Sequence, residues 1–354
     1  MLGSASVEIA EPGGAMRVLV SGDIGPDGGT MQPRPEGPQS GVDHAIVEST
    51  YGDEDRPSVT PEARREELAR LVHAAARGAG TLLIPTFAVE RAQEVVLDLV
   101  SLMDEGRIPA TTIHLDSPLA TRTSRIFASH AASLGDGRLV RAALASPRLR
   151  YVADFAESRR LAELTGFQVA LAGSGMCEAG RIRGHLKARL SEPSTVIALV
   201  GYQATGTLGR LLQDGVRRVR IQGDTYQVAA RVARVEGDSA HADGPELARW
   251  VAARAPISGG IFLVHGEPEA IEGMAKRVLD DGAAPAQQVI RPVLDEVFTL
   301  SRSRRAHPEA VGLPDWYNVR AALLLEMEAA LDDAGDDAAR LALLSRMRSA
   351  INPG

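Results

Sequence analysis

Four polar side chains stand where apolar stretches of the chain end. Asp23 and Glu48 follow two predicted strands, His265 follows a third, and His241 follows a turn. In open α/β sheets, ligands gather outside the carboxyl ends of the strands. Two carboxylates and two imidazoles are the groups that bind a metal such as zinc and transfer protons. Each also has a structural interpretation, since a strand-end carboxylate commonly caps a turn, so the hypothesis requires all four to converge.

The elements that must position these side chains follow different patterns along the chain. Apolar runs at residues 5–10 and 16–20, separated by turn residues, predict a hairpin, and residues 44–47 predict another strand. From residue 60 to about residue 200, helical spacing alternates with short strands, which predicts a largely parallel sheet with crossover helices. Beyond residue 219 strands return, ending with a buried strand over residues 260–264.

Local signals mark several helix starts and the C-terminal region. Thr60-Pro61 and Ser117-Pro118 each combine a capping side chain with proline at the first helical position, which predicts the start of a helix. Beyond residue 300 we expect a linker over Ser301–Pro308. Two amphipathic helices are then expected near Asp315–Asp332 and Asp336–Ile351.

The composition is that of a globular protein. Of the 354 residues, 44% are hydrophobic and 24% charged, which excludes wholesale disorder. We expect no membrane span, since no stretch of 18 apolar residues occurs, and a cytoplasmic location, since no signal-peptide pattern is present. The single cysteine, Cys177, is expected to be a small buried apolar residue. The net charge of −7 argues against nucleic-acid binding through bulk charge but leaves room for a local basic groove.

Ten short runs in a fixed order along residues 1 to about 270 carry a family resemblance. They are Leu2-Gly3-Ser4-Ala5, Ser21-Gly22-Asp23, Glu48-Ser49-Thr50-Tyr51-Gly52-Asp53, Pro85-Thr86-Phe87-Ala88, Asp116-Ser117-Pro118, Gly173-Ser174-Gly175-Met176, Gly201-Tyr202-Gln203, Gly206-Thr207-Leu208, Ser239-Ala240-His241-Ala242-Asp243 and Val264-His265-Gly266-Glu267. On these runs the chain resembles the metallo-β-lactamase-fold ribonucleases that carry a β-CASP insert. That family includes bacterial ribonuclease J and the eukaryotic pre-mRNA 3′-end-processing endonuclease.

The resemblance implies an α/β fold, a partial metallo-β-lactamase αββα sandwich with an inserted β-CASP α/β domain. Residues 1–52 and 240–300 are expected to form the metallo-β-lactamase domain, whose N-terminal half the sequence lacks. Residues 53–239 are expected to form the β-CASP domain, and residues 301–354 a helical tail.

The same resemblance implies a zinc-dependent hydrolase that cleaves RNA phosphodiester bonds in RNA processing or decay. Asp23 would bridge two zinc ions and His265 would bind one of them. His241 would donate a proton to the leaving oxygen, and Glu48 would orient its imidazole. The implied partner is RNA, in single-stranded form, and a homo-oligomer is compatible with the pattern.

A glycine-rich turn, Gly173-Ser174-Gly175, follows one predicted strand. It lacks the Gly-x-Gly-x-x-Gly spacing and the lysine of nucleotide-binding loops. The resemblance places it, together with Ser239, near RNA phosphates, although a turn serine explains Ser239 equally well. Basic residues on the next predicted helix favour a solvated face, with an RNA cleft as the alternative: Arg181, Arg183, Lys187 and Arg189, together with His185.

The sequence departs from the family pattern in its histidines. Family members carry a His-x-His-x-Asp-His run upstream and a zinc-binding histidine just before the run at Leu2, whereas the eight histidines here form no His-x-His. Asp23 and His265 alone cannot fix two zinc ions, because even one catalytic zinc normally has three protein ligands. We therefore expect weak or no cleavage by this chain alone. A miscalled start codon, an inactive relic and a partial subunit all account for the departure, and a non-catalytic RNA-binding or assembly subunit is the alternative function.

The sequence leaves three questions open. It does not decide between endonucleolytic and exonucleolytic cleavage, between RNA and DNA as substrate, or between oligomeric states.

Overall fold

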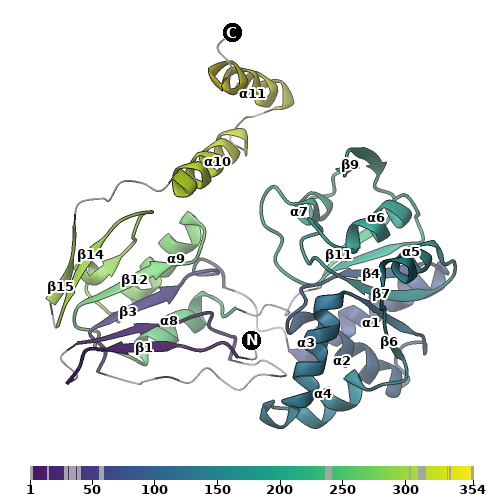
Figure 1. Ribbon diagram of the computed structural model, residues 1–354, viewed down its shortest axis with the longest axis horizontal. Coiled ribbons are helices and arrows are strands. Elements are labelled where there is room, and N and C mark those ends of the chain that lie inside the picture. The colour runs from purple at the N-terminus through teal and green to yellow at the C-terminus, as the bar shows by residue number, and fades with distance from the viewer. Residues whose placement is uncertain are drawn as a thin grey trace.

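The computed structural model describes residues 3–13, 16–27, 31, 37, 41–55, 60–235, 241–302, 304–309, 316–332, 334 and 336–351. Two β-sheets form two lobes, and the chain passes from the first lobe to the second and back again (Figure 1). The expected α/β class with parallel sheets is confirmed. The strands of one large sheet lie before residue 52 and after residue 239, and those of the other lie between these expected domain limits. The limits themselves stay a prediction.

The first sheet has the order β1-β2-β3-β12-β13. Its strands are β1 (Val7–Ala10), β2 (Arg17–Val20), β3 (His44–Glu48), β12 (Gly260–Val264) and β13 (Val289–Ile290). β1 and β2 form the expected antiparallel hairpin, and the remaining pairs are parallel. Helices α8 (Gly244–Ala252) and α9 (Pro268–Asp280) cover one face, where Leu19, Val47 and Leu263 pack against Trp250 and Met274.

The second sheet is parallel throughout, with the order β11-β8-β4-β7-β5-β6. Its strands are β4 (Thr81–Pro85), β5 (Ile113–Asp116), β6 (Leu149–Tyr151), β7 (Gln168–Ala172), β8 (Val196–Leu199) and β11 (Arg231–Arg234). The helices between them are α1 (Pro61–Arg77), α2 (Arg91–Asp104), α3 (Pro118–Ser129), α4 (Gly137–Leu144), α5 (Phe155–Glu163), α6 (Ile182–Arg189) and α7 (Leu208–Gln213), with a short 3₁₀ turn at Ala131–Ser133. The hairpin β9 (Arg218–Ile221) and β10 (Asp224–Gln227) stands beside this sheet.

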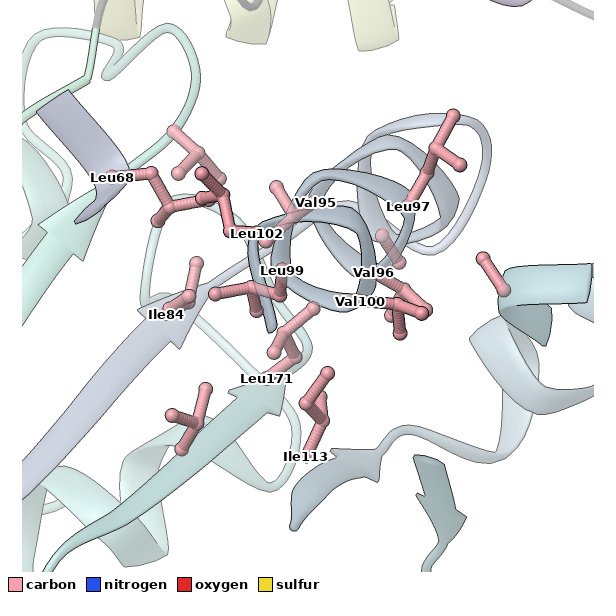
Figure 2. Close-up of a cluster of buried hydrophobic side chains, with 14 of the residues drawn as sticks. Leu68, Ile84, Val95, Val96, Leu97, Leu99, Val100, Leu102, Ile113 and Leu171 are labelled. Atoms are coloured by element: carbon pink, nitrogen blue, oxygen red, sulfur yellow. The ribbon is translucent and has the colours of Figure 1, made fainter. Parts of the chain in front are cut away.

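The largest apolar core lies between this sheet and the helices of one face. In Figure 2, Leu99 of α2 points toward Ile84 and Leu171 of two adjacent strands, and Leu102 lies beside Leu68 of α1. A second core on the other face of the sheet contains Cys177, which is fully buried as expected, and burial raises the pKa of its thiol to about 12. With both faces covered, the strands can be apolar along their whole length. The sheet is therefore a rigid support for the loops at its ends.

Helix starts agree with their local signals. The Thr60 side chain accepts a hydrogen bond from the Ala63 amide, and Ser117 accepts one from Ala120, each just ahead of proline at the first helical position. α8 begins with a reciprocal capping box between Asp243 and Glu246. Within the described residues, no helix is both long and apolar enough to cross a membrane.

The linker expected over Ser301–Pro308 is wrong. β14 (Phe298–Ser301) and β15 (Arg304–Pro308) form a hairpin that packs on the first sheet, where the Phe298 ring meets Phe262 edge-on at 5.0 Å and His44 Nε2 lies 3.0 Å from the Ser301 carbonyl oxygen. Most side chains of β15 face solvent and are polar, so the sequence lacks the apolar pattern that predicts a strand. The two expected helices are present as α10 (Trp316–Asp332) and α11 (Asp337–Ile351), which lie apart from both lobes in Figure 1.

The segment Gly52–Asp53, through which the chain leaves the first lobe, packs closely against α9. A Cβ atom on Gly273 would lie 2.4 Å from the Cα atom of Asp53, and Arg277 Nε donates a 2.8 Å hydrogen bond to the Gly52 carbonyl. No side chain fits between α9 and this crossing segment.

Replacing Gly273 by alanine should therefore lower the free energy of unfolding by about 1–3 kcal/mol, because overpacking against backbone outweighs the helical preference of alanine. The matched control is Gly184→Ala in α6, where a Cβ atom would meet nothing within 4 Å. That variant should gain about 0.5–1 kcal/mol. Urea unfolding followed by circular dichroism measures both, and equal shifts in the two variants would contradict the packing argument.

Candidate metal centre

Asp23, Glu48, His241 and His265 converge at the carboxyl edge of the first sheet. A carboxylate oxygen of Asp23 lies 3.6 Å from Nδ1 of His265, and the rings of His265 and His241 are 5.7 Å apart. Glu48 and His241 form a direct pair at 2.9 Å although 193 positions separate them. The structure thus brings together all four residues that the sequence singled out.

The sheet order explains this convergence. β3 and β12 are adjacent parallel strands in which Glu48 pairs with Val264, so the residue after Val264, His265, emerges beside Glu48. β2 lies on the other side of β3, and the turn that follows it carries Asp23. His241 arrives on the segment that leads into α8, where the Ala242 amide donates a 2.7 Å hydrogen bond to the Ile24 carbonyl.

The Glu48 carboxylate is buried and held by several donors. It accepts hydrogen bonds from the Thr50 hydroxyl at 2.6 Å and from the Ile24 amide, in addition to its contact with His241 Nδ1. A carboxylate at Nδ1 fixes the tautomer and orientation of an imidazole and leaves Nε2 to face a ligand or substrate. The pair therefore presents one defined ring nitrogen of His241.

The backbone around His265 is held in an uncommon conformation. Its φ angle is +54°, in the left-handed region that side chains with a Cβ atom adopt rarely. The His265 carbonyl accepts a 3.2 Å hydrogen bond from the Ser49 amide, and the Thr50 hydroxyl oxygen also lies 3.2 Å from it. A Cβ atom on Gly266 would lie 2.6 Å from the Ser49 carbonyl oxygen. The strand end of Glu48 and the His265 turn are therefore packed backbone to backbone, which aims the imidazole at Asp23.

Three of the four residues form a set that fits a metal ion. Asp23, His241 and His265 each offer one ligand atom, and these atoms all lie within 4.8 Å of one another. Two zinc bonds of about 2.0–2.1 Å at the tetrahedral angle place donor atoms roughly 3.3 Å apart, close to the 3.6 Å between Asp23 and His265. One carboxylate and two imidazoles are a common donor set for zinc. The described residues thus fit one zinc ion when His241 is the third ligand, and Asp23 and His265 without it supply two.

Of the expected substrate-binding residues, the structure describes Gly173, Ser174 and Gly175. Ser239 lies outside the described residues. Gly173, Ser174 and Gly175 follow β7 at the carboxyl edge of the second sheet, and their hydrogen bonds stay within that loop and its neighbours, as in the 3.0 Å bond from Gln203 Nε2 to the Gly175 carbonyl. The structure does not bring them into hydrogen-bond contact with the four converging residues.

The basic residues of α6 and its start differ in burial and all have acidic partners. His185 and Arg189 are buried, and Arg189 lies 3.1 Å from Glu192. Lys187 pairs with Asp224 at 3.1 Å, and Arg183 lies 3.7 Å from Glu178. The solvated face is therefore wrong for the buried His185 and Arg189, whereas Arg183 and Lys187 are partly exposed. The RNA cleft stays a prediction.

A buried cluster around Asp116 escaped the sequence analysis. Asp116 is fully buried and receives hydrogen bonds from Ser158 at 2.5 Å and Arg181 at 2.6 Å, with His185 Nε2 at 2.7 Å. The signal was present, because Asp116 ends an apolar strand as Glu48 does. Its partners come from α5 and α6, however, and nothing local links them to it.

Comparison with known proteins gives two family matches. The β-CASP domain model matches residues 92–212, and the model of the Zn-dependent metallo-hydrolase RNA specificity domain matches residues 225–287.

Curated relatives align with about three quarters of this chain. It is 33% identical over 279 residues to Ribonuclease TTHA0252 of Thermus thermophilus, covering 77% of this chain and 62% of that relative. It is 28% identical over 279 residues to Transcription termination factor FttA of Pyrococcus abyssi, covering 76% and 43%. It is 26% identical over 276 residues to an RNase J-like protein of Methanocaldococcus jannaschii, covering 75% and 62%. The chain thus spans less than two thirds of the length of each of these relatives.

Proposed function

Because this chain belongs to the metallo-β-lactamase-fold family of RNA nucleases that carry a β-CASP domain, we propose that its function is zinc-dependent hydrolysis of RNA phosphodiester bonds. We propose further that this activity is impaired in the sequence as written, because the His-x-His-x-Asp-His zinc motif of the family is absent from it. The observation that supports this most directly is the Glu48–His241 pair beside the Asp23–His265 pair. One pair holds a proton-carrying imidazole, and the other offers metal ligands. Metal-assisted phosphodiester hydrolysis needs both functions within one site.

We propose that Asp23 and His265 are the metal ligands of this site. When bound, zinc supplies Lewis-acid polarisation of the phosphate and lowers the pKa of water. Asp23 contributes the anionic oxygen, and its backbone is fixed because its carbonyl accepts a 3.0 Å hydrogen bond from the Ser4 hydroxyl. The family is zinc-dependent. Asp23 and His265 supply two of the three protein ligands that a catalytic zinc normally has, so a complete one-ion site, and still more the two-ion arrangement that the resemblance implies, requires further ligands.

His241 acts as the proton donor in this proposal. Glu48 stabilises the charged imidazolium, and its own position is fixed by Thr50 and Ile24. Protonated Nε2 then delivers its proton to the oxygen that leaves the phosphorus atom, so that the product does not depart as an alkoxide. The imidazole is only partly buried, which lets it recover a proton from solvent.

The proposed substrate is single-stranded RNA. The match to an RNA specificity domain over residues 225–287 includes both His241 and His265. An unpaired strand exposes each phosphodiester bond to a site formed by strand-end loops.

Asp23→Ala is expected to weaken zinc binding at least about 100-fold, because it removes the anionic ligand itself, whereas changes in outer-shell partners typically cost 10- to 100-fold. Equilibrium dialysis with metal analysis measures the stoichiometry and affinity. The control is Asp224→Ala, which removes an exposed carboxylate that pairs with Lys187 in the other lobe. Equal zinc affinity in the parent and Asp23→Ala would remove Asp23 from the metal site.

The function itself is tested with the zinc-loaded protein and a 5′-labelled single-stranded RNA. Zinc-dependent fragments that disappear with a chelator support hydrolysis. RNA binding without zinc-dependent cleavage would favour the alternative, a non-catalytic RNA-binding or assembly subunit. The observation behind that alternative is that the eight histidines of this sequence form no His-x-His pair.

A further inference from the structure

Phe87 is an exposed aromatic side chain at the carboxyl edge of the second sheet. It follows β4, which lies between β7 and β8 in the sheet, and 40% of its surface is accessible to solvent. The loops that follow these three strands therefore emerge side by side. This is the edge at which ligands of open parallel sheets bind.

The Phe87 ring rests on two glycines from separate loops. A Cβ atom on Gly175, in the loop after β7, would lie 2.6 Å from the ring, and one on Gly201, after β8, would lie 3.4 Å from it. A side chain at Gly175 would displace the ring. The glycines thus form a bed along the Cδ2–Cε2 edge of the ring, while 40% of the surface of Phe87 stays accessible.

A chain of contacts joins this ring to the proposed proton donor. Tyr202 follows Gly201, and its hydroxyl donates a 2.7 Å hydrogen bond to Glu267 in the first lobe. The Tyr202 ring meets Tyr51 edge-on at 5.8 Å, and Tyr51 in turn lies 6.3 Å from the His241 ring. Phe87 therefore lies beside the segment of the second lobe, at Tyr202, that contacts the first lobe next to the metal centre.

We propose that Phe87 is a stacking platform for one nucleobase of single-stranded RNA, an inference that rests on the proposed function. An exposed ring face takes any base, so a single aromatic residue can hold a strand without selecting its sequence. With a net charge of −7, the protein gains little affinity from bulk attraction to phosphate. Only 4% of its residues are aromatic, so stacking must depend on few positions. The glycine bed fixes the ring before RNA arrives, which reduces the entropy cost of binding.

The test uses the full chain and a pentauridylate in which 2-aminopurine replaces the middle base, with chelator present to prevent cleavage; the uridine neighbours stack weakly and leave the free probe bright. Stacking quenches 2-aminopurine, so fluorescence reports the contact and anisotropy of an end label reports affinity. Phe87→Ala should weaken binding by about fivefold to 100-fold and abolish the quenching. Phe87→Leu keeps an apolar side chain but loses the π face and should behave similarly, whereas Phe87→Trp should retain both signals.

Phe155→Ala is the matched control, because Phe155 is also an exposed phenylalanine of the second lobe, with 63% accessibility, but lies beside β6 with the Arg159 guanidinium over its ring. It should bind RNA as the parent does. Parent-like affinity and quenching in Phe87→Ala would overturn the platform, as would a parent protein that leaves 2-aminopurine unquenched. Zinc binding and cleavage are scored separately, so quenching through Phe87 without cleavage would sustain the platform and reject the proposed hydrolysis. If Phe87→Ala cleaved and bound RNA as the parent does, the proposed hydrolysis would be sustained and the platform rejected.

Discussion

Once the zinc ligands that the family pattern places upstream are restored, His241→Ala is expected to lower the rate of zinc-dependent RNA cleavage by about 10²- to 10⁴-fold, the usual contribution of a positioned general acid or base, while zinc affinity stays close to that of the parent. The physical reason lies in the Glu48–His241 pair. The buried carboxylate holds Nδ1 at 2.9 Å and so commits the imidazole to deliver its proton from Nε2. The substitution by alanine removes the imidazole that carries the proton but leaves the ligands Asp23 and His265 in place.

Measuring turnover and metal content on the same preparation separates this role from a ligand role. His241 also belongs to the group of three residues whose ligand atoms lie within 4.8 Å. If His241→Ala lost zinc and activity together, His241 would be a metal ligand and not the proton donor. Parent-like turnover would remove it from the mechanism. His130→Ala, at an exposed histidine at the end of α3, is the control for a general effect of losing an imidazole.

Glu48→Gln provides a second test of the same pair. The amide keeps the size of the side chain but no longer stabilises a charged imidazolium. Turnover should fall while the fold and the zinc content are maintained. Loss of folding in this variant would show that Glu48 serves mainly as a support for the backbone at Ile24.

Asp116→Ala is expected to lower the free energy of unfolding by about 3–5 kcal/mol, because it leaves buried partners without their carboxylate. Arg181 and His185 both lie within 2.7 Å of that carboxylate, which is fully buried. The control, Asp224→Ala, removes an exposed partner of Lys187 and should cost less than about 1 kcal/mol. Urea unfolding measures both variants, and equal losses would contradict the assigned role of Asp116.

The pH dependence of stability provides a further test of Asp116. Burial raises the pKa of this carboxyl group, but hydrogen bonds from His185, Ser158 and Arg181 together outweigh burial and hold the pKa below its usual 3.8. A pKa that is lower in the folded state than in the unfolded state gives stabilisation that is complete above about pH 4 and disappears as the pH falls through the folded-state value. Acidification should therefore destabilise the parent more steeply than Asp116→Ala.

The sequence by itself determined the local structure and the candidates for the site. Thr60-Pro61 and Ser117-Pro118 predict helix starts because capping and the fixed φ of proline act within one turn. Apolar runs that end in Asp23, Glu48 and His265 identify strand ends, because side-chain alternation and turn residues are local as well. The ordered family runs then indicate a shared site, and the structure brings all four residues together.

Only the tertiary structure decided which side chains meet. The Asp116 cluster joins β5 to two later helices, the Phe87 ring rests on glycines from two other loops, and Phe298 packs against Phe262. Each contact depends on strand order and on the close approach of distant backbone segments, and neither leaves a periodic pattern along the chain. The helix with Arg181 and His185 shows this most clearly. Its charges predict an exposed face, whereas a buried carboxylate from another strand draws both side chains inward.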